Sequence, residues 1–149
     1  MAINTLLNYN RSANNISRSG PFSLIPGTPL LLAEFGLFVP QSVNFIELIS
    51  TVGWEAFTDT VGPGLQSEIS FFITQDNVVV FSTHEEAPGD PVTIDGNLSV
   101  TTSFQGVLTN VATGHHVYRL FVQNLEPTQN TNMVIGPVTI SGKVIGPEA

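Results

Sequence analysis

The residues best suited to chemistry in this chain are its histidines and the carboxylates beside them. His115 and His116 are adjacent, and a second group lies at His84-Glu85-Glu86. A metal site on a strand needs imidazoles on one face, whereas adjacent residues of a strand point to opposite faces. One metal ion therefore cannot easily bind both His115 and His116. We interpret these histidines as polar turn residues and expect no required metal and no cofactor.

The third histidine lies in an acidic, proline-rich segment. Residues 84–91 contain Pro88 and Pro91, which predict a loop because proline cannot donate to a sheet hydrogen-bond ladder. A weak cation site at His84 is the lesser alternative there. Solvated polar loop residues are the interpretation that we adopt.

The sequence carries no pattern for nucleophilic or acid–base catalysis. It lacks a Gly-x-Ser-x-Gly elbow, and no serine stands in a recognisable order with a histidine and an aspartate. Glu85 and Glu86 are expected in solvent rather than in a cleft, and Gly62-Pro63-Gly64 lacks the lysine of a phosphate loop. We therefore predict that the protein is not an enzyme.

The elements that position these residues have the two-residue period of β-strands. Residues 43–54 set Ile46, Leu48, Val52 and Trp54 against Phe45, Glu47, Ile49 and Thr51. Similar alternation marks residues 67–74, 98–108, 118–123 and 133–145, and Asp76-Asn77 predicts a tight hairpin turn. No segment has a helical period. An all-β, antiparallel jelly roll or sandwich of about eight strands is the predicted fold, over residues 21–149.

One predicted strand, residues 28–39, is apolar on both faces. Alternation places Leu31, Ala33, Phe35, Leu37 and Val39 on one face, and Leu30, Leu32 and Phe38 on the other. A strand needs only one apolar face to pack on its own core. Such a strand is either buried on both sides or packed against another subunit, and in the second case Leu30, Leu32 and Phe38 are the candidate residues of a lateral interface.

Composition also favours self-association. Only 11% of the 149 residues are charged, against about 25% in an ordinary soluble domain, while 42% are hydrophobic. Interface cores are depleted in charge, so we expect a trimer or a laterally packed ring. The net charge of −8 argues against nucleic acid, and no stretch is apolar enough for membrane insertion. Because cysteine is absent, contacts between subunits must be non-covalent.

Residues 1–20 differ from the remainder and are interpreted as an N-terminal connector arm. Arg11 and Arg18 give this segment a charge of +2, whereas the remaining residues carry −10. Its asparagines could satisfy backbone groups, and its apolar residues could fill pockets on a neighbour's sheet edge. The predicted assembly residues are Ile3, Leu6, Leu7, Tyr9, Arg11, Ile16 and Arg18.

Two segments near the C-terminus carry a family resemblance. His116-Val117-Tyr118-Arg119-Leu120-Phe121-Val122 and Gly136-Pro137-Val138-Thr139-Ile140-Ser141-Gly142 resemble the last two strands of C1q and tumour-necrosis-factor-like jelly rolls. The chain is similar in style to bacterial exosporium head domains and to the subunits of endospore appendage fibres. That resemblance implies a spore or cell-surface location, although residues 1–20 lack the pattern of a secretory signal. It implies a fibre subunit whose partners are its own copies, with an anchor or tip protein as a further partner.

Two other classes of protein share these features. A viral or phage capsid, decoration or fibre-head jelly roll would have the same architecture and composition. A carbohydrate-binding module would need Trp54 and Phe57 in an exposed platform, although a single tryptophan on a strand is more often in the core.

Overall fold

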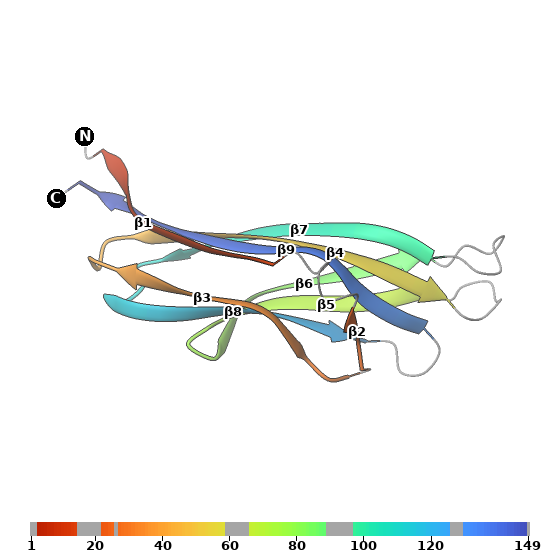
Figure 1. Ribbon diagram of the computed structural model, residues 1–149. Helices are drawn as coiled ribbons and strands as arrows, with labels where there is room; N and C mark the ends of the chain where they lie inside the picture. Colours follow the sequence, from red (N-terminus) through yellow and green to blue (C-terminus); the bar gives the residue numbers. More distant parts are fainter. Residues whose placement is uncertain are drawn as a thin grey trace.

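The computed structural model is a sandwich of two antiparallel sheets (Figure 1). It describes residues 3–14, 22–25, 27–58, 66–88, 97–125 and 130–148, and contains no helix within them. The first sheet, sheet A, has the order β1-β9-β4-β7, and β2 pairs with the end of β9. Its strands are β1 (Asn4–Asn14), β2 (Phe22–Ser23), β4 (Phe45–Thr58), β7 (Asn97–Thr109) and β9 (Asn130–Pro147).

The second sheet, sheet B, has the order β3-β8-β5-β6. Its strands are β3 (Leu30–Val39), β5 (Gln66–Gln75), β6 (Val78–Pro88) and β8 (Gly114–Asn124). Among the described strands, only β5 and β6 are neighbours both in the sheet and in the chain, and the other pairs join strands that are distant in sequence. This interleaving of two sheets is the jelly-roll arrangement, and it confirms the predicted fold class.

The core lies between the sheets and follows the predicted alternation in β4 and β9. Ile46, Leu48, Val52 and Trp54 are fully buried. The tryptophan Nε1 donates a hydrogen bond of 2.9 Å to Thr102 Oγ1 on the neighbouring strand β7. A buried indole N–H needs such an acceptor, so Thr102 fixes the orientation of the largest core side chain.

The predicted hairpin at Asp76-Asn77 is confirmed. Both residues have positive φ angles, 49° and 71°, as a two-residue turn of type I′ requires. Aspartate and asparagine tolerate this conformation better than other non-glycine residues do. The turn joins β5 to β6 and places the Asp76 side chain at one end of the sandwich.

The prediction of two separate apolar faces on β3 needs a correction. A register shift between Leu31 and Ala33 interrupts the alternation, so Leu30 and Leu32 are half-buried and pack against the core. Leu31 is instead the exposed leucine, at 46%, and Phe38 is 43% exposed. The β-bulge adds a residue to one strand and thereby exchanges the faces of the side chains before it.

The predicted loop at residues 84–91 is wrong in its first part. Residues 84–88 continue strand β6, where His84 lies opposite Ser70 and Glu86 opposite Glu68 on β5. Strand β6 is one of the two edge strands of sheet B. One side of an edge strand is unpaired, so charged residues and a proline are tolerated there. Residues 89–91 lie outside the described residues.

Candidate functional site

The N-terminal segment forms an edge strand on its own chain. Strand β1 pairs antiparallel with β9 from Asn4 opposite Pro147 to Asn14 opposite Val138. Figure 1 shows β1, in red, beside the blue β9 at the margin of the sandwich. The element that receives β1 is therefore the edge of strand β9. Whether that strand comes from the same chain or from a neighbour, the edge needs a partner for its backbone groups.

Two asparagines tie β1 to the edge of the opposite sheet. Asn8 Nδ2 donates to the Phe38 carbonyl at 2.9 Å, and Asn10 Nδ2 donates to the Gly36 carbonyl at 2.7 Å. Each asparagine Oδ1 also accepts a hydrogen bond of 2.8 Å from the next backbone N–H of β1. We call this pair the asparagine clamp. It satisfies unpaired donors of β1 and unpaired acceptors of β3, and so joins two edge strands.

The apolar residues of β1 point in two directions. Leu7 is half-buried against the core, at a register shift between Leu6 and Asn8. Ile3, Leu6 and Tyr9 are exposed. The shift explains why strict alternation from Ile3 to Tyr9 does not describe this strand, because the bulged residue adds one position.

The charged residues of the arm are only partly described. Arg11 is exposed and lies opposite Ser141 of β9. Ile16 and Arg18, also predicted for assembly, lie outside the described residues. The structure therefore places Leu6, Leu7, Tyr9 and Arg11 on strand β1, with Ile3 directly before its first residue.

Both outer faces of the sandwich carry apolar side chains. On sheet A the register aligns Leu6, Ile145 and Phe45 in one row across β1, β9 and β4. On sheet B the rings of Phe72 and Phe121 stack at 5.0 Å between centroids, and Leu31 lies opposite Phe121. These rows are the outward apolar surfaces that a lateral contact would use.

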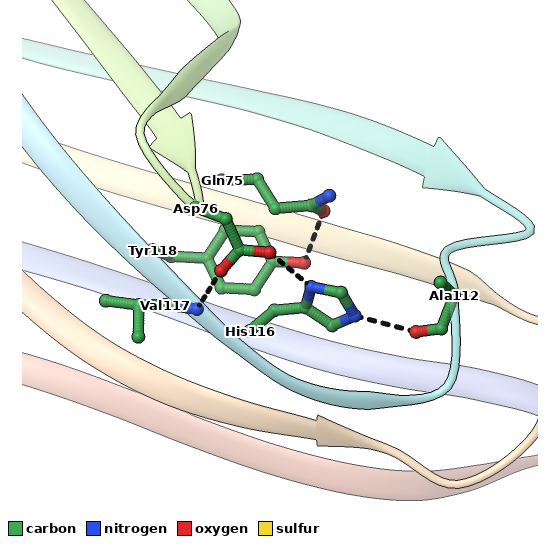
Figure 2. A network of polar contacts seen from close by, with 6 residues as sticks. All are labelled: Gln75, Asp76, Ala112, His116, Val117 and Tyr118. Atoms are coloured by element: carbon green, nitrogen blue, oxygen red, sulfur yellow. Dashed lines mark hydrogen bonds and ion pairs between the residues drawn. The ribbon is translucent and has the colours of Figure 1, made fainter.

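The two adjacent histidines are separated, as the geometry of a strand requires. The His115 ring lies 4.9 Å from the ring of Phe38, between centroids, on the outer face. His116 lies at the end of the sandwich, where its Nδ1 is 2.6 Å from Asp76 Oδ2 and its Nε2 is 2.7 Å from the Ala112 carbonyl oxygen (Figure 2). The two imidazoles therefore do not share a ligand position.

The contacts of His116 require a proton on each ring nitrogen. A carboxylate and a carbonyl are both acceptors, so the imidazole donates twice and is positively charged. Asp76 is held in turn by the Val117 backbone N–H at 2.9 Å. Figure 2 also shows Tyr118 Oη donating to Gln75 Oε1 at 2.8 Å. This polar network joins the β5–β6 turn, strand β8 and the segment before β8.

Electrostatics reinforce the pair. Burial alone would lower the pKa of His116, but the hydrogen bonds to Asp76 and Ala112 and the charge of Asp76 outweigh it and raise that pKa above 6.5. Burial likewise opposes the shift at Asp76, yet hydrogen bonds from Val117 and His116 lower its pKa below 3.8, together with the charges of His116 and Arg119. Burial and the charge of Asp76 raise the pKa of Tyr118. The histidine and the aspartate are thus both charged in mildly acidic solution.

This pair predicts a pH-dependent contribution to stability. A raised histidine pKa stabilises the fold below 6.5, and the contribution is lost as the pH rises through the folded value. A lowered aspartate pKa stabilises the fold above 3.8, and the contribution is lost as the pH falls through the folded value. The stability difference between wild type and His116→Gln should therefore be largest between these limits, at about 1 kcal/mol because Asp76 is half-exposed.

Urea unfolding of wild type, His116→Gln and the control His115→Gln over a pH series measures this difference. The unfolding free energy of the control should depend on pH as that of wild type does, because His115 makes a ring contact on the exposed face. A difference between wild type and His116→Gln that does not change with pH would show that the ion pair contributes nothing.

Sequence reasoning identified His116 and the Asp76 turn separately but did not pair them. The two residues are 40 positions apart and meet because β5 and β8 are neighbours in sheet B. The preference of Asp76 for a hairpin turn gave its local conformation only. Nothing in the local sequence indicates its partner.

No family model and no curated protein matches this chain. Among solved structures, Eiger TNF from S. frugiperda aligns with a TM-score of 0.45 and 12% identity, over 99% of this chain and 95% of that one. Dimeric latent PorU from Porphyromonas gingivalis aligns with a TM-score of 0.41 and 9% identity, over 99% of this chain but only 14% of that one. The fold assignment therefore depends on the strand order itself.

The structure argues against a carbohydrate-binding platform built on Trp54. Trp54 is fully buried in the core and bonded to Thr102, so its ring offers no surface to a sugar. A stacking platform needs an exposed aromatic face.

Within the described residues there is no helix that could span a membrane.

Proposed function

We propose that the protein is a structural subunit that assembles with copies of itself into a surface fibre, and that strand β1 of one subunit docks on β9 of the next. The observation that supports this proposal most is the place of β1. It is a terminal edge strand, held by backbone pairing to β9 and by the asparagine clamp to β3. A terminal strand held by such contacts can make the same contacts with another copy.

Exchange of strand β1 between two subunits would use the same contacts that hold β1 within one chain. Asn8 and Asn10 would donate to the Phe38 and Gly36 carbonyls of the neighbour, and Leu7 would pack against the neighbour's core. Because the bonds in the exchanged form equal those within one chain, chain connectivity and concentration decide between the two forms. An exchange that does not close on itself produces an open polymer.

Charge favours the same arrangement. Arg11 is exposed on β1, while the remainder beyond residue 20 carries −10. Attraction between opposite charges speeds the approach of an arm to a neighbouring body. Lateral contacts, as a trimer or a helical fibre, would use the outward apolar rows, including Leu31, Phe38 and the Phe72–Phe121 stack.

The setting proposed for this fibre is a spore or cell surface, as in exosporium and endospore appendage assemblies, with an anchor or tip protein as a further partner. The absence of cysteine makes it a non-covalent kind of fibre. A viral or phage capsid, decoration or fibre-head protein is the alternative, since the same outward apolar rows would serve a shell.

Negative-stain microscopy of the purified full-length protein tests the proposal. We expect thin fibres of one repeating subunit. Closed shells or rings would favour the viral alternative, and dispersed particles at all concentrations would contradict both assemblies.

A further inference from the structure

A second group of metal-ligating side chains lies on sheet B, away from the arm and from the Asp76–His116 pair. Glu68 of β5 and His84 and Glu86 of β6 bring one ligand atom each to within 4.8 Å of one another. His84 and Glu86 stand two positions apart in the sequence, whereas Glu68 lies far from them along the chain. The sheet register supplies the third ligand, because Glu68 lies directly opposite Glu86.

The strand geometry places all three side chains on one face. Ile69 is buried in the core, so its neighbour Glu68 points outward. His84 and Glu86 are two positions apart on β6 and share that face, whereas Glu85 lies opposite Ile69 and points the other way. The group is therefore fixed by backbone pairing on two adjacent strands rather than by a loop.

The arrangement is unfavourable without a cation. Like charges directly opposite each other on paired strands destabilise a sheet. Among the described residues, Arg119 is bound to Glu34 and Asn77, and the strands of Arg11 and Lys143 belong to sheet A. No arginine or lysine of the described chain is paired with Glu68 or Glu86, and the side chain that the structure places beside Glu86 is that of His84.

We propose that Glu68, His84 and Glu86 bind a divalent transition-metal ion, with Zn²⁺ as the best fit. The His84 Nε2 to Glu86 Oε1 separation is 3.4 Å. Tetrahedral zinc with bonds of about 2.1 Å places its ligands about 3.4 Å apart. An imidazole nitrogen beside two carboxylates selects zinc over calcium and magnesium, which prefer oxygen ligands throughout.

Three protein ligands leave the fourth position open. His84 and Glu86 are about half-exposed, so water can reach the ion from the outer face. The ion would neutralise the Glu68–Glu86 pair and join the start of β5 to the end of the edge strand β6. The site is independent of the proposed fibre, and its test does not require assembly.

Equilibrium dialysis of the chelator-treated full-length protein against zinc chloride tests the site, since it reads monomer and fibre alike. We expect one zinc per chain in wild type. Glu86→Gln, Glu68→Gln and His84→Ala should each weaken binding by at least about tenfold. Zinc should also raise the melting temperature of wild type but not that of Glu86→Gln.

Two matched controls distinguish the site from general attraction to an acidic protein. Glu85→Gln removes the same charge as Glu86→Gln from the adjacent position, and His115→Ala removes another exposed histidine. Both should bind zinc as wild type does. The proposal would be overturned if Glu85→Gln and Glu86→Gln lost zinc affinity equally, or if all variants bound zinc as wild type does. It would also be overturned if wild type showed no saturable zinc binding.

Discussion

Deletion of residues 2–20 is expected to abolish fibres and to leave a folded sandwich. Among the described residues, the fully buried core side chains lie beyond the arm, from Leu37 to Val144, so the body keeps its core. The deletion removes the strand that pairs with β9 and both members of the asparagine clamp. The edge of β9 then has unpaired backbone groups and no donated strand to cover it.

Negative-stain microscopy measures the loss of fibres, and circular dichroism measures whether the sandwich is still folded. As a control, a synthetic peptide of residues 2–20 added to the shortened protein should raise its melting temperature by occupying the β9 edge, without restoring fibres. Normal fibres from the shortened protein would remove the connector role.

Replacement of Gly53 by alanine is expected to destabilise the fold by about 3 kcal/mol or more. A Cβ added at Gly53 would lie 2.1 Å from the carbonyl oxygen of Gly136 and 2.7 Å from its carbonyl carbon. These are backbone atoms of β9, the strand paired with β4 at the centre of sheet A, and they cannot rotate away. The two strands would have to separate beside Val52 and Trp54, which are fully buried.

Gly36→Ala is the matched control for this substitution. Its added Cβ would meet only the His116 carbonyl oxygen, at 4.0 Å, which is an ordinary contact. We expect a stability change within about 0.5 kcal/mol of wild type for Gly36→Ala. For Gly53→Ala, thermal unfolding should show a melting temperature lower by about 10 °C. Similar melting temperatures for the two variants would mean that β4 and β9 are less closely packed than the structure indicates.

The alternation of β4 and β9 was predictable because each strand buries one face. A side-chain period of two leaves a clear pattern when the other face is polar or half-exposed, as Glu47 and Thr51 show. Strand β3 gave no such signal, since Leu30, Leu31 and Leu32 are alike and a bulge among them leaves the pattern unchanged. The outward leucine was therefore assigned to the wrong positions.

Composition also gave a wrong local prediction at residues 84–88. Glutamates and a proline are poor residues for a central strand, but β6 is an edge strand, and a single sequence does not reveal the order of strands in a sheet. For the same reason, the Glu68–Glu86 and Asp76–His116 pairs could not be predicted, because each pair joins strands whose order in the sheet is not visible in the sequence. Side-chain types were visible in the sequence, whereas their partners depended on topology.

The central claim is that β1 docks between subunits, and a mixed-disulfide experiment tests it directly. The chain contains no cysteine, so introduced cysteines have no native competitor. Ala13 of β1 lies opposite Thr139 of β9. The Arg11 N–H bonds to Asn10 rather than to β9, so by alternation Ala13 also belongs to a pair without backbone hydrogen bonds, where side chains are closest.

One population would carry Ala13→Cys and a second, larger by a tag, would carry Thr139→Cys. A chain with both substitutions is the control that shows the geometry permits the bond. After mixing, assembly and mild oxidation, a non-reducing gel should show the disulfide-linked pair of unequal chains, which only docking between subunits can form. If the double variant closes its disulfide within one chain and the mixture gives no unequal pair, β1 stays on its own subunit and the account is contradicted.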